Sequence, residues 1–258
     1  MKLSVNFILI ATLLVVGSLA ADHWTYSHLD EWPINCQSGK KQSPIAISKR
    51  NAIRIDLKKL KFDNYDNDDI KTTLENNGHT GGGLSSTYVL DNIHFHWGSE
   101  HTIDGGRHPL EAHLVHYKQT CGNMVNASNY PDGLVVLAVM FDVACCTNKD
   151  LAIVTNSVKS VSKNLHSTLR IQDDFKPEVF LPDNTKCYYM YTGSLTTPGC
   201  NEVVTWLMFE DAISISQTQL NQLSQVYTDA GKLLSYNFRP LQELHGRKVF
   251  YTSASDCD

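Results

Sequence analysis

Two histidines stand two positions apart in an apolar run that has the composition of a β-strand. His94 and His96 alternate there with Phe95 and Trp97, so both imidazole rings leave the same face of the strand. Two imidazoles on one face could hold a zinc ion between them. The pair alone is weak evidence, because eleven histidines scattered over 258 residues give this spacing by chance roughly 0.5 times.

A second strand-like run supplies a third imidazole and a carboxylate. Glu111, His113 and Val115 share one face of this run, whereas His116 points to the opposite face, where we expect a structural role. Three histidines with one coordination position left open are typical of a catalytic zinc site. A structural site would need four protein ligands, usually with thiolates, and no two cysteines have Cys-x-x-Cys spacing. The spacing therefore favours a catalytic zinc over a structural one.

These residues belong to a series of short apolar runs that are typical of strands. The runs span residues 88–97, 110–117, 134–141, 188–192 and 203–209. Asp, Asn, Gly and Pro separate them without a helical pattern in every gap, which disfavours repeated βαβ units. The predicted fold is predominantly β (α+β), a single domain with a large central, mostly antiparallel twisted sheet and a few peripheral helices.

Two segments have the apolar period of a helix. The second begins at Ser216, which has capping-box spacing with Gln219, and places Leu220, Leu223 and Tyr227 on one face. In the first segment, apolar residues recur at steps of three and four, and we expect this helix to cover one face of the sheet. Its apolar positions are Leu151, Val154, Val158, Val161, Leu165 and Leu169.

The first twenty residues have the pattern of a secretory signal. Lys2 precedes an apolar stretch over residues 7–16, and Ser18 and Ala20 provide the small residues of a cleavage site. Ten helical residues span about 15 Å of a roughly 30 Å hydrocarbon layer, which disfavours a membrane anchor. We therefore expect a signal peptide at 1–20 and a secreted, extracellular chain at 21–258. The polar C-terminus, 251–258, carries no lipid-anchor signal.

The composition of the chain disfavours nucleic acid and anionic membranes as binding partners. Lys and Arg total 22 against 27 Asp and Glu, and the net charge of −5 offers no basic surface for nucleic acid or anionic lipid. Apolar residues make up 42% of the chain, which is enough for a full core. No linker-like stretch divides residues 21–258, so we expect one domain. The sequence leaves the oligomeric state open.

Secretion permits disulfide bonds, and an odd number of cysteines leaves at least one thiol unpaired within the monomer. Asn126-Ala127-Ser128 is the only N-glycosylation triplet, and it lies in a polar stretch where a glycan could project into water. A chance triplet explains it almost as well. The seven cysteines are Cys36, Cys121, Cys145, Cys146, Cys187, Cys200 and Cys257.

The histidine motifs resemble those of the α-class carbonic anhydrases, and the resemblance extends over essentially the whole chain after residue 20. It implies a secreted zinc enzyme that interconverts carbon dioxide and bicarbonate through zinc-bound hydroxide, with Zn²⁺ held by His94, His96 and His113. Separate motifs in the family's order make the resemblance specific. They are Trp24 and Tyr26, Gln42-Ser43-Pro44-Ile45, Asn76-Asn77-Gly78-His79, His94-Phe95-His96-Trp97-Gly98, Ser99-Glu100-His101-Thr102, Glu111-Ala112-His113-Leu114-Val115-His116, Gly193-Ser194-Leu195-Thr196-Thr197-Pro198, Thr205-Trp206 and Asn237-Phe238-Arg239-Pro240.

The resemblance also implies how the substrates are oriented. Thr196 would accept the proton of the hydroxide and donate its own to Glu100, which aims the nucleophile at carbon dioxide. Without the resemblance, we would interpret the two residues as a turn hydroxyl and a solvated acid. Carbon dioxide is small and uncharged and needs an apolar surface, although ordinary core packing would also explain the apolar residues that form it. By resemblance the substrate-binding residues are Val115, Leu134, Val136, Leu195, Thr196, Thr197, Val204 and Trp206.

Further roles follow from the same resemblance. Asn92 and Glu111 would support the ligands, and Glu111 would fix the tautomer of His113. His79 occupies the position of the family's proton shuttle, for which a plain surface histidine is the competing interpretation. Cys36 and Cys200 match the disulfide of secreted family members, whereas the other five cysteines have no assignment by resemblance.

The chain is shorter than the family pattern next to the proposed shuttle. Only 14 residues separate His79 from His94, and family members with a shuttle histidine carry roughly twice that number, enough for another strand or two. A second shortening follows Ser99. We therefore keep an alternative, a non-catalytic or low-activity carbonic-anhydrase-related protein that binds a partner, and a spliced or shortened form would also explain the gap.

Overall fold

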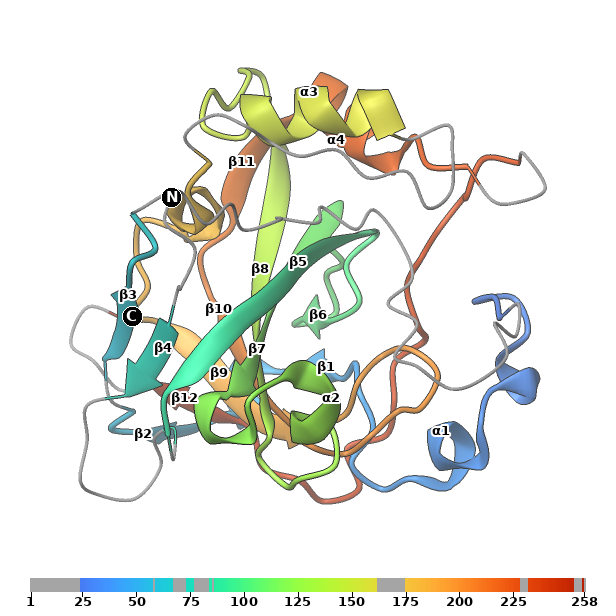
Figure 1. The fold of residues 1–258 in the computed structure, drawn as a ribbon, viewed down its shortest axis with the longest axis vertical. Helices are drawn as coiled ribbons and strands as arrows, with labels where there is room; N and C mark the ends of the chain where they lie inside the picture. Colours follow the sequence, from blue (N-terminus) through green and yellow to red (C-terminus); the bar gives the residue numbers. More distant parts are fainter. Residues whose placement is uncertain are drawn as a thin grey trace.

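The computed structural model describes residues 24–57, 59–66, 73–76, 84, 86–161, 175–227, 232–252 and 257, and its main element is a ten-stranded sheet (Figure 1). β11 (Ile213–Ser216) pairs with β8 outside the main path of that sheet, and β1 (Ala46–Ile47) with β6 (Thr102–Ile103) forms a separate small sheet. The main path runs β2 (Ile53–Ile55), β12 (Phe250–Thr252), β9 (Tyr188–Gly193), β10 (Val204–Phe209), β8 (Leu134–Ala144), β7 (Leu110–Lys118), β5 (Tyr88–Trp97), β4 (Thr73–Asn76) and β3 (Leu60–Asp63).

Most neighbouring strands in this sheet are antiparallel, which confirms the predicted fold class. The strands β3, β4, β5, β7 and β8 are antiparallel in succession, and β9 is antiparallel to both β10 and β12. Parallel pairing joins β8 to β10, β8 to β11 and β2 to β12. All five predicted strands are present. β8 continues three residues past its predicted end because β11 pairs with that extension as far as Ala144.

Helices are few and peripheral (Figure 1). In the described part of the chain, no helix has the length and apolar character needed to cross a membrane. The α-helices are α1 (Ile34–Ser38), α2 (Met124–Ala127), α3 (Ala152–Val161) and α4 (Gln217–Ser224), and the 3₁₀ turns are η1 (Leu29–Glu31), η2 (Lys49–Asn51), η3 (Gln119–Cys121) and η4 (Pro177–Phe180).

The two predicted helices are present in part. The described helix α3 ends at Val161, and residues 162–174, which hold Leu165 and Leu169, lie outside the described residues. The capping box is present at the start of α4, with Ser216 and Gln219 bonded reciprocally. The placement of Tyr227 on this helix is wrong, because the chain leaves helical geometry at Gln225 and Tyr227 bridges to Leu233 instead.

The sheet separates two apolar clusters, and each strand contributes alternate side chains to them. One cluster includes Phe95, Leu114 and Leu137 of the central strands, and α3 and α4 cover it with Val154 and Leu223. The other cluster lies on the face that carries His94, His96 and His113, and residues of β8, β9 and β10 form half of it. α3 and α4 therefore stabilise the sheet from the side away from the histidines, whereas only the short helix α2 packs on the histidine side among the described helices, through Met124 and Ala127.

A β-bulge in β5 decides which residues share the histidine face. Leu90 pairs with His116, but two residues later Asn92 pairs with Val115, so Asp91 is the extra residue. Without the bulge, Leu90 and His94 would lie on the same face of β5, because they are four residues apart. With the extra residue between them, Leu90 instead packs against the cluster that α3 and α4 cover. The bulge therefore reverses the side to which even-numbered residues point. Before it they face the helix-covered cluster, and after it they face the histidine side.

Two disulfide bonds tie distant segments together. Cys36 and Cys200 are joined as the resemblance implies, with Cα atoms 5.1 Å apart. Cys187 is joined to Cys257, with Cα atoms 5.3 Å apart, a pairing that the sequence left unassigned. Three thiols remain free, those of Cys121, Cys145 and Cys146, rather than the minimum of one.

Candidate metal centre and active site

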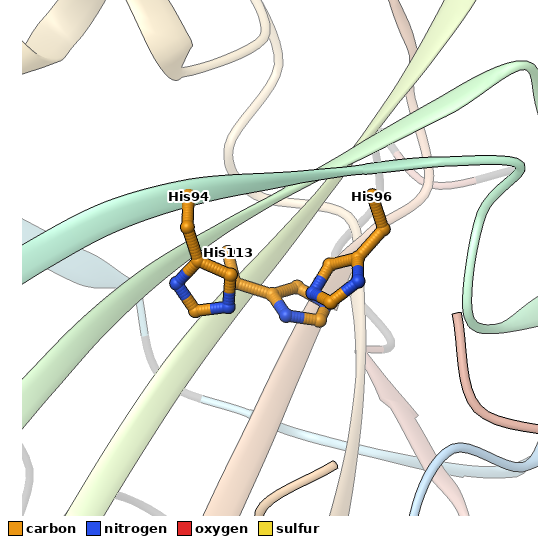
Figure 2. Close-up of side chains that lie close together, drawn as sticks. All are labelled: His94, His96 and His113. Atoms are coloured by element: carbon orange, nitrogen blue, oxygen red, sulfur yellow. The ribbon is translucent and has the colours of Figure 1, made fainter. Parts of the chain in front are cut away.

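The three predicted ligand histidines converge from two adjacent strands (Figure 2). His94 and His96 leave one face of β5, and His94 is paired directly with His113 of β7. One ring nitrogen of each histidine lies within 4.8 Å of those of the other two. His96 and His113 are buried, whereas His94 is half-buried. The pairing of β5 with β7 thus brings the three imidazoles together, and His94 is the most solvent-exposed of them.

Each of the three rings is oriented by an oxygen that can only accept a hydrogen bond. His94 Nδ1 donates to Asn92 Oδ1 (3.0 Å), His96 Nδ1 to the Asn237 carbonyl (2.6 Å), and His113 Nε2 to Glu111 Oε1 (2.6 Å). A neutral imidazole that donates from one nitrogen keeps a lone pair on the other. The free atoms are therefore His94 Nε2, His96 Nε2 and His113 Nδ1. Three lone pairs in one place are the donor set that a zinc ion takes.

The remaining nitrogen of His96 supports the fit of a metal ion. His96 Nε2 is fully buried and has no hydrogen-bond partner among the described residues. A buried polar atom without a partner costs about 1–3 kcal/mol, so such atoms call for an explanation. Coordination of a cation would satisfy this atom. The free nitrogens of His94 and His113 lie close enough to bind the same cation.

The contact that orients His96 comes from Asn237 in the C-terminal part of the chain, a residue for which the sequence predicted no individual role. Besides its carbonyl bond to His96, Asn237 accepts a hydrogen bond from the amide of Trp97 and donates one to the carbonyl of Phe95. Asn237 thus holds the end of β5 from both sides of the histidine. It belongs to the Asn-Phe-Arg-Pro motif, which was the only signal in the sequence that could have found it.

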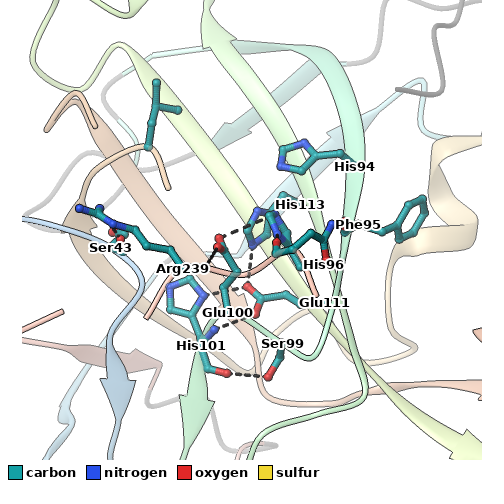
Figure 3. Close-up of polar contacts among 12 residues, drawn as sticks. Ser43, His94, Phe95, His96, Ser99, Glu100, His101, Glu111, His113 and Arg239 are labelled. Carbon is teal, nitrogen blue, oxygen red and sulfur yellow. Dashed lines mark hydrogen bonds and ion pairs between the residues drawn. The ribbon is translucent and has the colours of Figure 1, made fainter. Parts of the chain in front are cut away.

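A second group of titratable residues lies behind the first (Figure 3). Glu111 Oε1 accepts hydrogen bonds from His113 and from His101 Nδ1 (2.7 Å), and Glu111 Oε2 accepts one from the amide of His101 (2.9 Å). His101 Nε2 meets the hydroxyl of Tyr191 at 2.6 Å. Both nitrogens of His101 are thus occupied by protein groups. This group is therefore a support for His113 rather than a second metal site.

Burial and neighbouring charges shift the pKa values of these groups in a direction that suits metal binding. Burial, followed by the nearby His113 and His96, holds the pKa of His94 well below its usual value. Burial and His96 likewise lower the pKa of His113. Burial acts to raise the pKa of Glu111, but His101 and His113 outweigh it and leave the pKa well below its usual value. The rings of His94 and His113 are thus kept neutral and the supporting carboxylate ionised.

The apolar residues predicted to receive substrate lie on the histidine face. Val136 of β8 pairs with Val115 on one side and with Trp206 on the other, and Leu134 pairs with Val204. The ring of Trp206 lies 4.8 Å from that of His113. Leu195, half-buried, packs against the same cluster. Thr196 and Thr197 follow Leu195 in the β9–β10 connection.

Glu100 is placed beside the ligands, but one expected contact is not formed. Glu100 is fully buried, and its Oε1 accepts a hydrogen bond from the amide of Arg239 (2.8 Å). Its Oε2 lies 3.7 Å from His96 Nε2 and has no hydrogen-bond donor among the described residues. Thr196 is buried, yet its hydroxyl does not bond to Glu100 in this structure. The free Oε2 leaves Glu100 able to accept that bond.

The proposed shuttle cannot be placed, because His79 lies outside the described residues. The described strands do show one feature of this region. β4 pairs with β5 only at Val89 and Tyr88, so no described strand pairs with the His94–His96 part of β5 on the side away from β7.

His116 faces away from the ligands, as predicted, and contacts the hydroxyl of Tyr65 in the helix-covered cluster. Burial lowers its pKa from 6.5 to about 4. Between these values the unfolded chain binds a proton that the folded chain does not, so the associated stability is present above pH 6.5 and is lost as the pH falls through 4.

We expect the free energy of unfolding to fall by about 3 kcal/mol between pH 7 and 4 through this residue, at 1.36 kcal/mol per pKa unit. The His116→Phe variant lacks the titrating ring, so its free energy of unfolding should fall by about 3 kcal/mol less than that of the unmodified chain between pH 7 and 4. Urea titrations of both proteins at each pH measure the difference. Parallel pH curves would show that His116 does not contribute.

Comparison with known proteins identifies the family. A family model for the eukaryotic-type carbonic anhydrases matches residues 20–253. The chain is 33% identical to carbonic anhydrase 6 of Bos taurus, over 92% of this chain and 82% of that protein. It is also 33% identical to carbonic anhydrase 4 of Rattus norvegicus, over 96% and 90%, and to carbonic anhydrase 6 of Homo sapiens, over 94% and 88%.

The last of these alignments extends over 277 residues, more than the 258 of the whole chain, so the human protein has residues without a counterpart here. With the match of the family pattern over most of the chain, and three histidines brought together as the family motifs require, this protein belongs to the eukaryotic-type carbonic anhydrase family.

Proposed function

We propose that this protein is a zinc-dependent carbonate dehydratase, a lyase that interconverts carbon dioxide and bicarbonate. One observation carries the proposal: three histidines, each fixed by an oxygen acceptor, turn their lone pairs toward a common point. His94, His96 and His113 would hold Zn²⁺, leaving a fourth position open. When bound, zinc makes a water molecule acidic enough to react near neutral pH.

The residues around this point would orient the reactants. Glu100, held by the amide of Arg239, keeps Oε2 free to accept the hydroxyl proton of Thr196. Thr196 would then present its oxygen as an acceptor, which fixes the direction of the attacking oxygen. Such preorganisation lowers the barrier because no dipole has to reorient during the reaction.

Carbon dioxide carries no net charge, so an apolar surface beside the metal suits it better than a polar one. Val115, Val136 and Trp206 lie on the face of His113 and support this role. With them we propose Leu134, Leu195, Thr197 and Val204. His79 is proposed as the group that carries the proton to solvent, since histidine titrates near neutral pH.

The test is stopped-flow measurement of carbon dioxide hydration by the purified chain, before and after zinc is removed by a chelator and then restored. We expect acceleration over buffer that disappears on chelation and returns with zinc. A folded, zinc-loaded preparation that does not accelerate hydration would reject the proposal. The alternative, a non-catalytic relative that binds a partner, would give this result, but the complete histidine set does not favour it.

Zinc retention should depend on pH. A histidine coordinates only as the neutral ring, so protons compete with the metal. Burial lowers the pKa of His94 and His113, and we therefore expect zinc to be retained through pH 6.5 and released as the pH falls further. Metal analysis after dialysis between pH 8 and 4 measures this. Equal retention at every pH would contradict the histidine site.

We further propose that the protein is exported through the signal at residues 1–20 and acts outside the cell as the domain 21–258. Two observations support an extracellular protein. Its two disulfide bonds are of a kind that persists in oxidising compartments. Asn126 is exposed, which a glycan at this position requires.

A further inference from the structure

Cys145 and Cys146 form a pair of adjacent free thiols at the surface. Both side chains are exposed, and their sulfur atoms lie 3.2 Å apart. The pair directly follows β8, on the way to α3 (Figure 1). We propose that these two thiols are a binding site for a soft, thiophilic centre with bond angles near 90°, such as trivalent arsenic, which both sulfurs bind together.

The segment that holds the pair is fixed at both ends. On one side, Ala144 pairs with Ser216 of β11. On the other, the amide of Asn148 donates to Gln219 Oε1 (2.9 Å) and its carbonyl accepts from Gln219 Nε2 (2.7 Å). A chain anchored on both sides loses little freedom when both sulfurs bind one ion, which favours chelation over binding by one thiol.

The geometry of the sulfur atoms suits an ion with bonds near right angles. With metal–sulfur bonds of about 2.3 Å, two sulfurs 3.2 Å apart subtend an angle of about 90° at the ion. A tetrahedral site would need the sulfurs roughly 3.8 Å apart. Thiolate ligands in addition select soft ions over the hard cations that prefer oxygen.

Neither thiol has another cysteine of the chain to pair with. Cys121 follows β7 at the opposite end of β8, because Tyr117 pairs with Leu134 and the pair follows Ala144. Ten strand residues separate those ends by about 30 Å, whereas a disulfide needs Cα atoms within about 7 Å. The other four cysteines are already joined in two disulfides.

A disulfide between Cys145 and Cys146 themselves is disfavoured by the peptide bond. Adjacent Cα atoms are 3.80 Å apart across a trans peptide, shorter than the 4.4–6.8 Å that disulfides usually span, so the ring would be strained and readily reduced. The pair is also distant from the histidines. Ala138 pairs with His113, and six further residues of β8, about 20 Å, lead to Ala144.

Phenylarsine oxide is a suitable probe, because it reacts with two thiols together. Two As–S bonds form, the oxygen leaves as water with both thiol protons, and arsenic stays trivalent. We expect the purified full chain to have three thiols that react with an alkylating reagent, and one after treatment with the arsenical. Native mass spectrometry should find one phenylarsenic group bound.

Single substitutions separate chelation from simple thiol reactivity. Cys145→Ser and Cys146→Ser should each bind the arsenical roughly 100-fold more weakly, since the second sulfur no longer contributes. Cys121→Ser is the matched control and should bind as the unmodified chain does. Zinc content and hydration activity should stay unchanged in all three variants, so the result does not depend on the proposed enzymatic function.

Two results would overturn the site. One is binding by Cys145→Ser or Cys146→Ser that is as tight as that of the unmodified chain. The other is a purified protein in which either thiol is already consumed in a disulfide, within the chain or between two chains, as peptide mapping without reduction would reveal.

Discussion

Replacement of His94 by alanine should abolish carbon dioxide hydration. The variant keeps only two ring nitrogens at the proposed zinc position, which weakens metal binding, and the two strands have no other lone pair oriented to replace the lost one. Without the metal, the pKa of the water rises far above neutral pH, so the hydroxide nucleophile is no longer formed. We expect hydration to fall by at least about 1000-fold, to the rate in buffer.

His28→Ala is the matched control. His28 is exposed and makes no side-chain hydrogen bond at the start of η1. Its removal should change neither zinc content nor hydration rate. Stopped-flow hydration and metal analysis on the same samples separate the two variants, and circular dichroism checks their folding. Full activity in a folded His94→Ala protein would exclude the proposed metal centre.

Removal of the Cys36–Cys200 disulfide should lower both stability and activity. The bond closes a separation of 164 residues, and loss of such a constraint typically costs about 2–5 kcal/mol of unfolding free energy. Cys200 also lies in the loop that carries Thr196, where the amide of Cys200 donates to Thr197 and that of Leu195 to Asn201. We expect the Cys36→Ser, Cys200→Ser double variant to unfold at lower denaturant concentration and to hydrate more slowly while still folded.

The second disulfide supplies the control for this prediction. Cys187 and Cys257 are separated by 70 residues, and chain-entropy stabilisation differs between the two bonds by only about 1 kcal/mol. The second bond fastens the C-terminus to the start of β9 and does not hold the Thr196 loop. Its removal should lower the denaturation midpoint similarly but leave the hydration rate of the folded protein unchanged. Equal losses of activity in both variants would argue against a role for the first bond in the loop.

Local sequence patterns were sufficient for the strands and for the ligand face. The alternation around His94 and His96 and around His113 depends only on the two-residue period of a strand, so it predicts the face without knowledge of the partners. The helix around α4 was located by its capping box, which is also a local interaction. Its end was placed too late, because Tyr227 continues the apolar spacing after the backbone has left the helix.

Contacts between segments that are far apart in the chain could not be predicted from the sequence. Spacing could not reveal that the carbonyl of Asn237 orients His96, since the two residues are separated by 141 positions. The partner of Cys187 was likewise open, because several pairings of the remaining cysteines satisfy the chain equally well.

The sequence by itself determined the family, the strand-rich fold and which three imidazoles share a face, because motif order and side-chain alternation are properties of the chain alone. Only the tertiary structure decided that these rings carry lone pairs toward one point. That outcome depends on the bulge at Asp91, on the register between β5 and β7, and on acceptors from Asn92, Glu111 and the distant Asn237. Tautomers are fixed by hydrogen-bond partners, and packing of the whole chain selects those partners.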